Sequence, residues 1–221
     1  MEPYKDAFVE FLVETGALRF GDFKLKSGRE SPYFFNSGLF DTGDSIARLG
    51  YFYTCAMAGL SETPTVLFGP AYKGIPLCVA TATCLTQRFG TNVAYCFDRK
   101  ESKDHGEGGL LVGRVPKESD TICIVDDVIT SGATKLEAIE RLRSQTPAKV
   151  VSLVIALNRC EQDDEGGDPV AKLAERAGVE VRSIATIHDI LRHVTESGNK
   201  AAANAIRAYQ EQYGVEPLCQ S

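Results

Sequence analysis

The sequence predicts an α/β fold, with a mainly parallel central sheet flanked by helices. Short apolar segments recur along the chain, helical patterns lie between most of them, and the segments are apolar on both faces. Strands of this kind are covered on both sides, as in a parallel sheet whose strands are joined by helices. A length of 221 residues suits one such domain. The predicted strands span residues 65–69, 92–97, 121–125, 149–157 and 179–187.

Helices are predicted at both ends of the chain and between the strands. Near the N-terminus, apolar residues recur at helical spacing from Tyr4 to Leu12, and Gly16 is a typical stop signal. The other predicted helices span residues 44–60, 74–89, 132–145, 168–177 and 199–214.

A small hairpin is predicted after the first helix. In LRFGDFKLKSG, residues 18–28, apolar positions alternate on both sides of a turn at Gly21–Asp22, and Lys24 and Lys26 share one face. Residues 31–38, SPYFFNSG, form a further short extended segment.

Composition is that of an ordinary globular protein, with 43% apolar and 24% charged residues. The net charge of −6 argues against general binding to nucleic acid or to anionic membranes, so any basic site must be local. Apolar stretches are short, and the start MEPYKDAF lacks the apolar core of a signal peptide. We therefore expect a cytoplasmic protein.

Cysteine and histidine residues do not form a recognisable metal site. The seven cysteines form no C-x-x-C pair, and most lie in apolar context, which favours buried thiols in a reducing compartment. His188 and His193 lack partners at metal-ligand spacing and are expected to be structural. The cysteines are at positions 55, 78, 84, 96, 123, 160 and 219.

Three unusual loops follow predicted strands: GPAYKGIP (69–76), DRKESKDHGEGG (98–109) and the end of ICIVDDVITSGAT (122–134). Ligands of open parallel sheets bind beyond the carboxyl ends of the strands, so these loops are the candidate site.

The third loop combines two acids with small polar residues. Asp126 and Asp127 close the apolar run, and a glycine flanked by hydroxyl residues then leads into a helix whose first amides can hold a phosphate. Neither a G-x-x-x-x-G-K-[ST] nor a G-x-G-x-x-G motif occurs, which disfavours nucleotide hydrolysis and dinucleotide redox chemistry. Carboxylates beside a phosphate cradle suit a sugar phosphate. The alternative is that the two acids only cap a turn.

The other two loops are weaker signals taken singly. Lys73 lies among glycines and prolines that allow the backbone to approach an anion, although exposed Gly/Pro turns with one lysine are common. Residues 98–109 have the composition of a solvated, mobile loop. Placed after a strand, this basic loop can close over a charged substrate.

These motifs together identify a family. ICIVDDVITSGAT resembles the phosphoribosyl pyrophosphate (PRPP) motif of type I phosphoribosyltransferases. FGDFKLKSGRESPYFFNSGLF, LFGPAYKGIPL and YCFDRKESKDHGEGG resemble the bacterial-type orotate phosphoribosyltransferase family, and the resemblance covers nearly the whole chain. It implies a single type I phosphoribosyltransferase domain over residues 1–221, with a small hood formed mainly by 1–40 and a mobile catalytic loop over 98–113.

The resemblance also implies a role for particular residues. The catalytic residues would be Lys73, Lys103, His105, Asp126 and Asp127. Orotate would be bound by Lys26, Phe34, Phe35, Thr130 and Arg159. PRPP would be bound by Lys26, Tyr72, Lys73, Arg99, Lys100, Lys103, His105, Asp126, Asp127, Val128, Ile129, Thr130, Ser131, Gly132, Ala133 and Thr134. The loop at Tyr72 and Lys73 includes a non-proline cis peptide in relatives.

The implied reaction joins orotate and PRPP to give orotidine 5′-monophosphate and pyrophosphate, in the synthesis of UMP. Mg²⁺ would be the cofactor, held mainly through PRPP and water. Relatives are homodimers with shared active sites, in which the basic loop comes largely from the partner subunit. The alternatives are a PRPP-binding regulator without catalysis, or a phosphoribosyltransferase for another nucleobase. Neither nucleic acid nor membrane is an expected partner.

Two positions depart from the family pattern. Many relatives have a hydroxyl residue directly after the motif glycine, where this chain has Ala133 and then Thr134. Relatives often have Asp-Arg-Gln-Glu where this chain has Asn-Arg-Cys-Glu over 158–161. The first departure affects one phosphate hydrogen bond, and the second leaves Arg159 in place.

Overall fold

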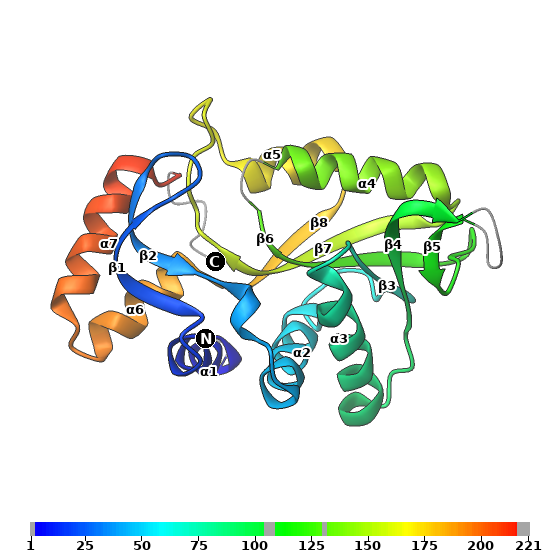
Figure 1. Ribbon diagram of the computed structural model, residues 1–221, viewed down its shortest axis with the longest axis horizontal. Helices are drawn as coiled ribbons and strands as arrows, with labels where there is room; N and C mark the ends of the chain where they lie inside the picture. Colours follow the sequence, from blue (N-terminus) through cyan, green and yellow to red (C-terminus); the bar gives the residue numbers. More distant parts are fainter. Residues whose placement is uncertain (1–2, 104–108, 130–131, 216–221) are drawn as a thin grey trace.

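The computed structural model describes residues 3–103, 109–129 and 132–215. Its centre is a six-stranded sheet in the order β5-β4-β3-β6-β7-β8 (Figure 1). All neighbouring strands in it are parallel except β4 and β5, which confirms the predicted, mainly parallel α/β fold. The strands are β3 (Val66–Gly69), β4 (Ala94–Lys103), β5 (Gly109–Gly113), β6 (Thr121–Val128), β7 (Lys149–Asn158) and β8 (Glu180–Thr186).

Helices cover both faces of this sheet. Along β6, Cys123 and Val125 belong to the core shared with α2 (Gly43–Met57) and α3 (Gly74–Phe89), while Ile122 and Ile124 belong to the core on the other face. That second core includes α4 (Ala133–Gln145) and α5 (Pro169–Ala177), which lie on the opposite side of the sheet in Figure 1. Side chains alternate between the faces of a strand, so both faces of β6 are apolar.

The N-terminal region and the last two helices form a second, smaller group beside the sheet (Figure 1). Helix α7 packs against β2, and α6 packs against α1, so the C-terminal helices support the segment predicted as the hood. The elements are α1 (Pro3–Glu14), β1 (Leu18–Lys24), β2 (Glu30–Phe35), the short 3-10 helix η1 (Ser37–Leu39), α6 (Ile187–Glu196) and α7 (Lys200–Tyr213).

The predicted turn at Gly21–Asp22 is wrong. Strand β1 runs through these residues and pairs with β2, and a bulge separates the pairs Phe20↔Tyr33 and Phe23↔Ser31. The chain reverses later, where the Leu25 amide donates to the Arg29 carbonyl at 2.9 Å. A one-residue bulge shifts the phase of apolar alternation just as a turn does, so the pattern alone did not separate the two.

The segment predicted as a loop over 98–113 contains paired strand at both ends. Asp98 lies opposite Leu111, and Lys103 lies opposite Gly109 in the antiparallel β4–β5 pair. Polar strand ends lack the apolar pattern that predicts strands. Within the described residues, no helix is long and apolar enough to cross a membrane.

Candidate functional site

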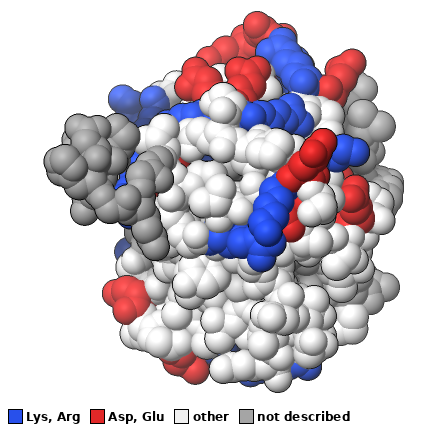
Figure 2. All heavy atoms as spheres, turned by 90° about the vertical axis from the view of Figure 1, so that its right-hand side faces the viewer, with Lys and Arg blue, Asp and Glu red and all other residues white. Residues whose placement is uncertain are grey.

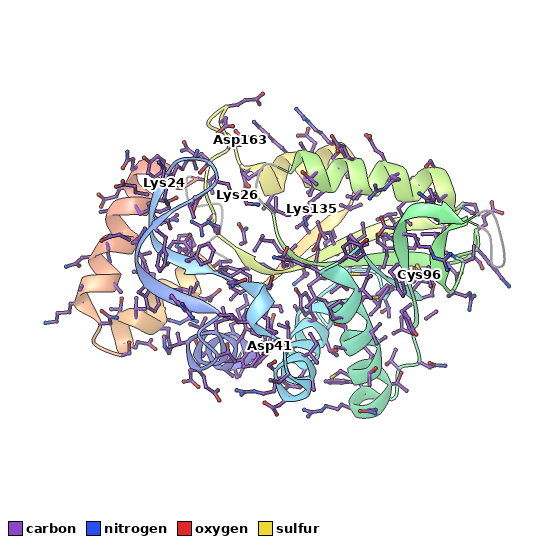
Figure 3. The ribbon with its side chains drawn as sticks, in the orientation of Figure 1. Lys24, Lys26, Asp41, Cys96, Lys135 and Asp163 are labelled. Carbon is purple, nitrogen blue, oxygen red and sulfur yellow. The ribbon has the colours of Figure 1, made fainter. Side chains whose placement is uncertain are left out.

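An open pocket of about 630 Å³ lies beyond the ends of β3 and β6. These neighbouring parallel strands lead into α3 and α4, which cover opposite faces of the sheet. Such a change of direction leaves a crevice between the two connections, where ligands of open α/β sheets bind. Figure 3 shows Lys135 at the start of α4 and Lys26 on the β1–β2 connection. The lining includes Tyr72, Lys73, Asp126, Asp127, Val128, Gly132, Thr134 and Lys135.

Each of the two aspartates at the end of β6 is paired with a lysine. Lys73 Nζ lies 3.0 Å from Asp127 Oδ2, and the Ser37 hydroxyl donates to the same oxygen at 2.8 Å. Lys135 Nζ donates to Asp126 Oδ2. The other oxygens, Oδ1 of each residue, accept the backbone amides of Asp127 and Val128 at 2.9 and 2.8 Å. The carboxylates are thus oriented by the turn itself and face the pocket.

The environments of the two carboxylates shift their pKa values in opposite directions. Burial raises the pKa of Asp126 above its usual value, and the ammonium of Lys135 opposes the shift only in part. Burial also acts on Asp127, but Lys73 and Ser37 outweigh it, so the pKa of Asp127 lies below its usual value. An opposite charge favours the ionised form, whereas desolvation disfavours it.

The loop before α3 contains the cis peptide bond that the family resemblance implies, between Ala71 and Tyr72. Backbone passes closely over Gly74, where an added Cβ would lie 2.5 Å from the Pro70 ring and 3.0 Å from the Val125 carbonyl oxygen. Only glycine fits there. Tyr72 is 66% exposed and lies at the rim of the pocket.

Asp98 holds this loop in place. Its buried carboxylate accepts the Ala71 amide at 2.7 Å and pairs with Arg141 of α4 at 2.9 Å. Each oxygen of this carboxylate thus accepts from one donor, an amide or a guanidinium, and these hydrogen bonds offset the cost of burying the charge. Asp98 therefore connects the 70–73 loop to the helix on the other side of the pocket.

Helix α4 begins where the predicted phosphate cradle ends. Its N-cap, Gly132, has φ of 76°, a conformation that favours glycine, and Thr134 lines the pocket while Ala133 lies nearby. The Ile129 side chain is buried in the core, so only its backbone can face a ligand. Thr130 and Ser131 lie outside the described residues.

The predicted hood residues differ in exposure. Phe34 is partly exposed and stacks on Phe23 with ring centroids 5.5 Å apart, whereas Phe35 packs against the core beside Phe40. The side chain of Lys26 is exposed. Of the predicted pair, Phe34 presents the accessible ring.

Arg159 lies beneath the hood in a buried network. Its Nε donates to Glu161 Oε1 at 2.7 Å, and a terminal nitrogen donates to the Ser31 hydroxyl at 3.1 Å. The guanidinium also lies 4.3 Å from the ring centroid of Tyr33, whose hydroxyl donates to Glu161 at 3.0 Å. Burial raises the pKa of Tyr33 well above its usual value, which keeps this donor protonated.

The basic loop is only partly visible. Arg99 is half-buried on β4 and is not among the residues that line the pocket. The side chains of Lys100 and Lys103, and His105 entirely, lie outside the described residues. The described part thus brings Tyr72, Lys73, Asp126, Asp127, Val128, Gly132 and Thr134 to one pocket, with Arg159 under the adjacent hood.

Several residues of the site were not predicted from the sequence. Lys135 could have been identified from the sequence. A cation in the first turn of a helix is disfavoured by the helix dipole, so its presence suggests a nearby negative charge. Ser37, Asp98 and Glu161 offered no such signal, because their partners come from distant segments.

The buried cysteines agree with the prediction of free thiols. Cys78, Cys96 and Cys123 are buried free thiols, and burial raises the pKa of Cys96 and that of Cys123 to about 12. Among the described residues no cluster of three or more His, Cys, Asp or Glu has the geometry of a metal site.

The fold is that of a phosphoribosyltransferase, and a phosphoribosyl transferase domain family model matches residues 46–188. Two curated relatives are orotate phosphoribosyltransferases. That of Nitrosococcus oceani is 46% identical and covers 98% of each chain, and that of Pseudomonas fluorescens is 44% identical over 97% of this chain and 100% of its own. The Francisella tularensis orotate phosphoribosyltransferase, whose crystal structure is known, is 33% identical in sequence. Its structure superposes on this one with a TM-score of 0.84, over 95% of this chain and 100% of its own. The chain belongs to the orotate phosphoribosyltransferase family.

Proposed function

We propose that this protein transfers the 5-phosphoribosyl group of PRPP to orotate, giving orotidine 5′-monophosphate and pyrophosphate in UMP synthesis. The observation that carries the proposal is the pair Asp126 and Asp127 at the end of β6, facing a pocket between two lysines. Carboxylates that accept hydrogen bonds, next to cations and a helix start, match a ribose with phosphates at both ends. Membership of the orotate phosphoribosyltransferase family supports the same assignment.

In this proposal the pocket is divided between the parts of PRPP. The aspartates accept from the ribose hydroxyls, and residues 128–134 at the start of α4 hold the 5′-phosphate. Lys73 and Tyr72 contact pyrophosphate. To do so, the Lys73 ammonium must leave its ion pair with Asp127 and bind a phosphate oxygen instead. The pairing of Lys73 with Asp127 at 3.0 Å supports a position for the ammonium at the boundary between these parts.

Catalysis then consists of positioning and charge stabilisation. Negative charge develops on the departing pyrophosphate, and Lys73 supplies a cation close to it. Lys103 and His105, with Arg99 and Lys100, are proposed to close over the pyrophosphate, and Lys103 or His105 to protonate it. Orotate is already an anion, so no strong base is needed.

Orotate is proposed to bind between the hood and Arg159, with Lys26, Phe34 and Thr130 beside it. A guanidinium offers forked donors to a planar carboxylate. Glu161, Ser31 and the Tyr33 ring already hold the Arg159 guanidinium, so it is oriented before orotate arrives.

Mg²⁺ is the proposed cofactor, and the residues present fit a metal that arrives with its substrate. Asp126 and Asp127 are each paired with a lysine, so the described chain offers no dedicated oxygen cage. Mg²⁺ commonly keeps several waters and binds through substrate phosphates. When bound, it would supply positive charge that offsets the charge of the departing pyrophosphate.

The function is tested by mixing the protein with PRPP, Mg²⁺ and orotate and following orotate absorbance. Uracil, adenine and hypoxanthine serve as parallel substrates. We expect turnover with orotate and with none of the other three bases. Turnover with another base instead, or PRPP binding without any product, would contradict the proposal.

A homodimer with shared active sites is part of the proposal. The β4–β5 strands extend the sheet at one edge, and this face carries a broad area of uncharged side chains in Figure 2. Exposed apolar residues such as Phe89 and Tyr95 are compatible with an interface. In a two-fold dimer each site would take its aspartates from one chain and Lys103 and His105 from the other.

Mixing two inactive variants tests this arrangement. An Asp126→Asn/Asp127→Asn protein and a Lys103→Ala protein are mixed under conditions that allow subunit exchange. With shared sites, half of the dimers are mixed and each has one intact site, so activity should return to roughly a quarter of wild type. If exchange is verified with tagged subunits and no activity returns, each loop serves its own chain.

We further propose that the chain acts as one cytoplasmic domain. The hood, mainly residues 1–40, is proposed to close one side of the site, and the catalytic segment within 98–113, which begins and ends in strands β4 and β5, to close the other. The packing of α7 on β2 supports a hood that is integral to the domain.

A further inference from the structure

Lys135 stands out because its position is unfavourable without a partner. It lies in the first turn of α4, where the helix dipole disfavours a cation. Nevertheless its side chain is largely enclosed, with 18% exposure, and its ammonium meets the Asp126 carboxylate, which is 8% exposed. Enclosing a cation at that end of a helix requires compensation by negative charge.

The charges around the two aspartates form an alternating arrangement. Lys73 approaches Asp127 from the start of α3, and Lys135 approaches Asp126 from the start of α4. Without Lys135, Asp126 would be a buried carboxylate next to the like charge of Asp127. Such a carboxylate tends to take up a proton, and a protonated acid is a poorer acceptor for hydroxyl groups.

Lys135 also lies beside the start of the helix proposed to hold phosphate. Gly132, Thr134 and Lys135 line the same pocket as the aspartates. An ammonium has three donors, and the bond to Asp126 uses one of them. A phosphate at this helix start would meet both the helix amides and this cation.

We propose that Lys135 is a further residue of the 5-phosphoribosyl site, which keeps Asp126 ready to accept the ribose hydroxyls and donates to the 5′-phosphate. This inference rests on the proposed function. It gives Lys135 and Lys73 separate tasks, one at each end of the sugar. The two lysines therefore respond to different fragments of the substrate.

The test measures the affinities of two fragments by calorimetry on the full chain. Ribose 5-phosphate probes the Asp126 and Lys135 side, and inorganic pyrophosphate probes the Lys73 side. We expect Lys135→Met to lower the affinity for ribose 5-phosphate about tenfold or more, as for a lost charge-assisted hydrogen bond. The affinity for pyrophosphate should change about twofold at most. Lys135→Arg, which keeps the charge, should retain most of the affinity.

Matched variants separate this role from a general structural one. Arg182→Met removes another cation that is paired with an acid, Glu180 at 2.7 Å on β8, and neither of these residues lines the pocket. It should leave both affinities unchanged. Lys135→Gln serves in place of Lys135→Met if the latter does not fold, because the amide can still donate to Asp126.

The pH dependence gives a second measurement. The groups that act on Asp126 are Lys135, the neighbouring Asp127 with its partner Lys73, and Tyr53, whose hydroxyl donates to the Asp126 carbonyl at 2.7 Å. Loss of Lys135 removes the influence that lowers the pKa of Asp126. As the pH is lowered, ribose 5-phosphate affinity should therefore begin to fall at a higher pH in Lys135→Met than in wild type. The ligand's own phosphate titrates at about 6 in both measurements and does not produce the difference.

Each outcome decides the question. If wild type binds ribose 5-phosphate and Lys135→Met binds it equally well, or loses both fragments equally, the inference is overturned while the proposed function stands. If wild type binds neither fragment, the proposed function fails with it. Selective loss of ribose 5-phosphate with rescue by Lys135→Arg supports the inference.

Discussion

Asp126→Asn combined with Asp127→Asn is expected to remove nearly all PRPP binding and turnover while the protein stays folded. Asparagine has nearly the same shape, but it replaces a charged acceptor with a neutral amide that has only one acceptor oxygen. Hydrogen bonds to charged groups contribute about 1.5–3 kcal/mol each. Losing two of them should therefore lower the affinity for PRPP more than about a hundredfold. Calorimetry with PRPP and circular dichroism of the variant measure the two expectations.

Pyrophosphate should behave differently from PRPP in this variant. With the carboxylates neutral, Lys73 and Lys135 lose their partners and the pocket becomes more positive. We expect pyrophosphate affinity to be kept or increased. Asp120→Asn is the matched control, because Asp120 is a buried aspartate at the opposite end of the same β6 region, bonded to the Lys117 amide at 2.7 Å. A folded double variant with unchanged PRPP affinity would remove the aspartates from the proposed site.

The second large effect is expected at Arg159, and the structure predicts that it has two parts. Arg159→Ala should raise the KM for orotate by about a hundredfold, because a forked, charge-assisted contact is lost, and should change the KM for PRPP far less. It should also lower the free energy of unfolding by about 1.5–3 kcal/mol, because Glu161 loses its closest cation and keeps only Arg29, at 3.7 Å, and the Tyr33 hydroxyl. Steady-state kinetics and chemical denaturation measure the two parts.

A double variant separates these effects. Adding Glu161→Gln to Arg159→Ala removes the carboxylate that is left with only Arg29 as a cation. The oxygen of the introduced amide can still accept from the Tyr33 hydroxyl, which donates to Glu161 at 3.0 Å in the wild type. Most of the lost stability should return, while the KM for orotate should stay high. If the KM for orotate recovers with stability, or if both KM values rise equally in Arg159→Ala, then Arg159 supports the hood and does not contact orotate.

The sequence by itself determined the layers of this protein and the position of its acids. Strand and helix periodicities are local properties, so the apolar runs around 65–69 and 121–125 and the helix over 74–89 were predictable one segment at a time. Asp126 and Asp127 lie at the carboxyl end of a buried strand, and in a parallel sheet that position alone puts them at the edge where ligands bind. The family resemblance added the cis peptide at Ala71–Tyr72.

Only the tertiary structure decided how those groups are paired. Lys73 and Asp127 are 54 positions apart, and Tyr33 and Glu161 are 128 apart, so their contacts depend on how elements pack. The bulge in β1 and the strand character of residues 98–103 also depend on cross-strand partners rather than on apolar pattern. Hydrophobic patterning specifies which face of an element is buried, whereas the partner of a buried charge is set by the three-dimensional arrangement that must compensate its desolvation.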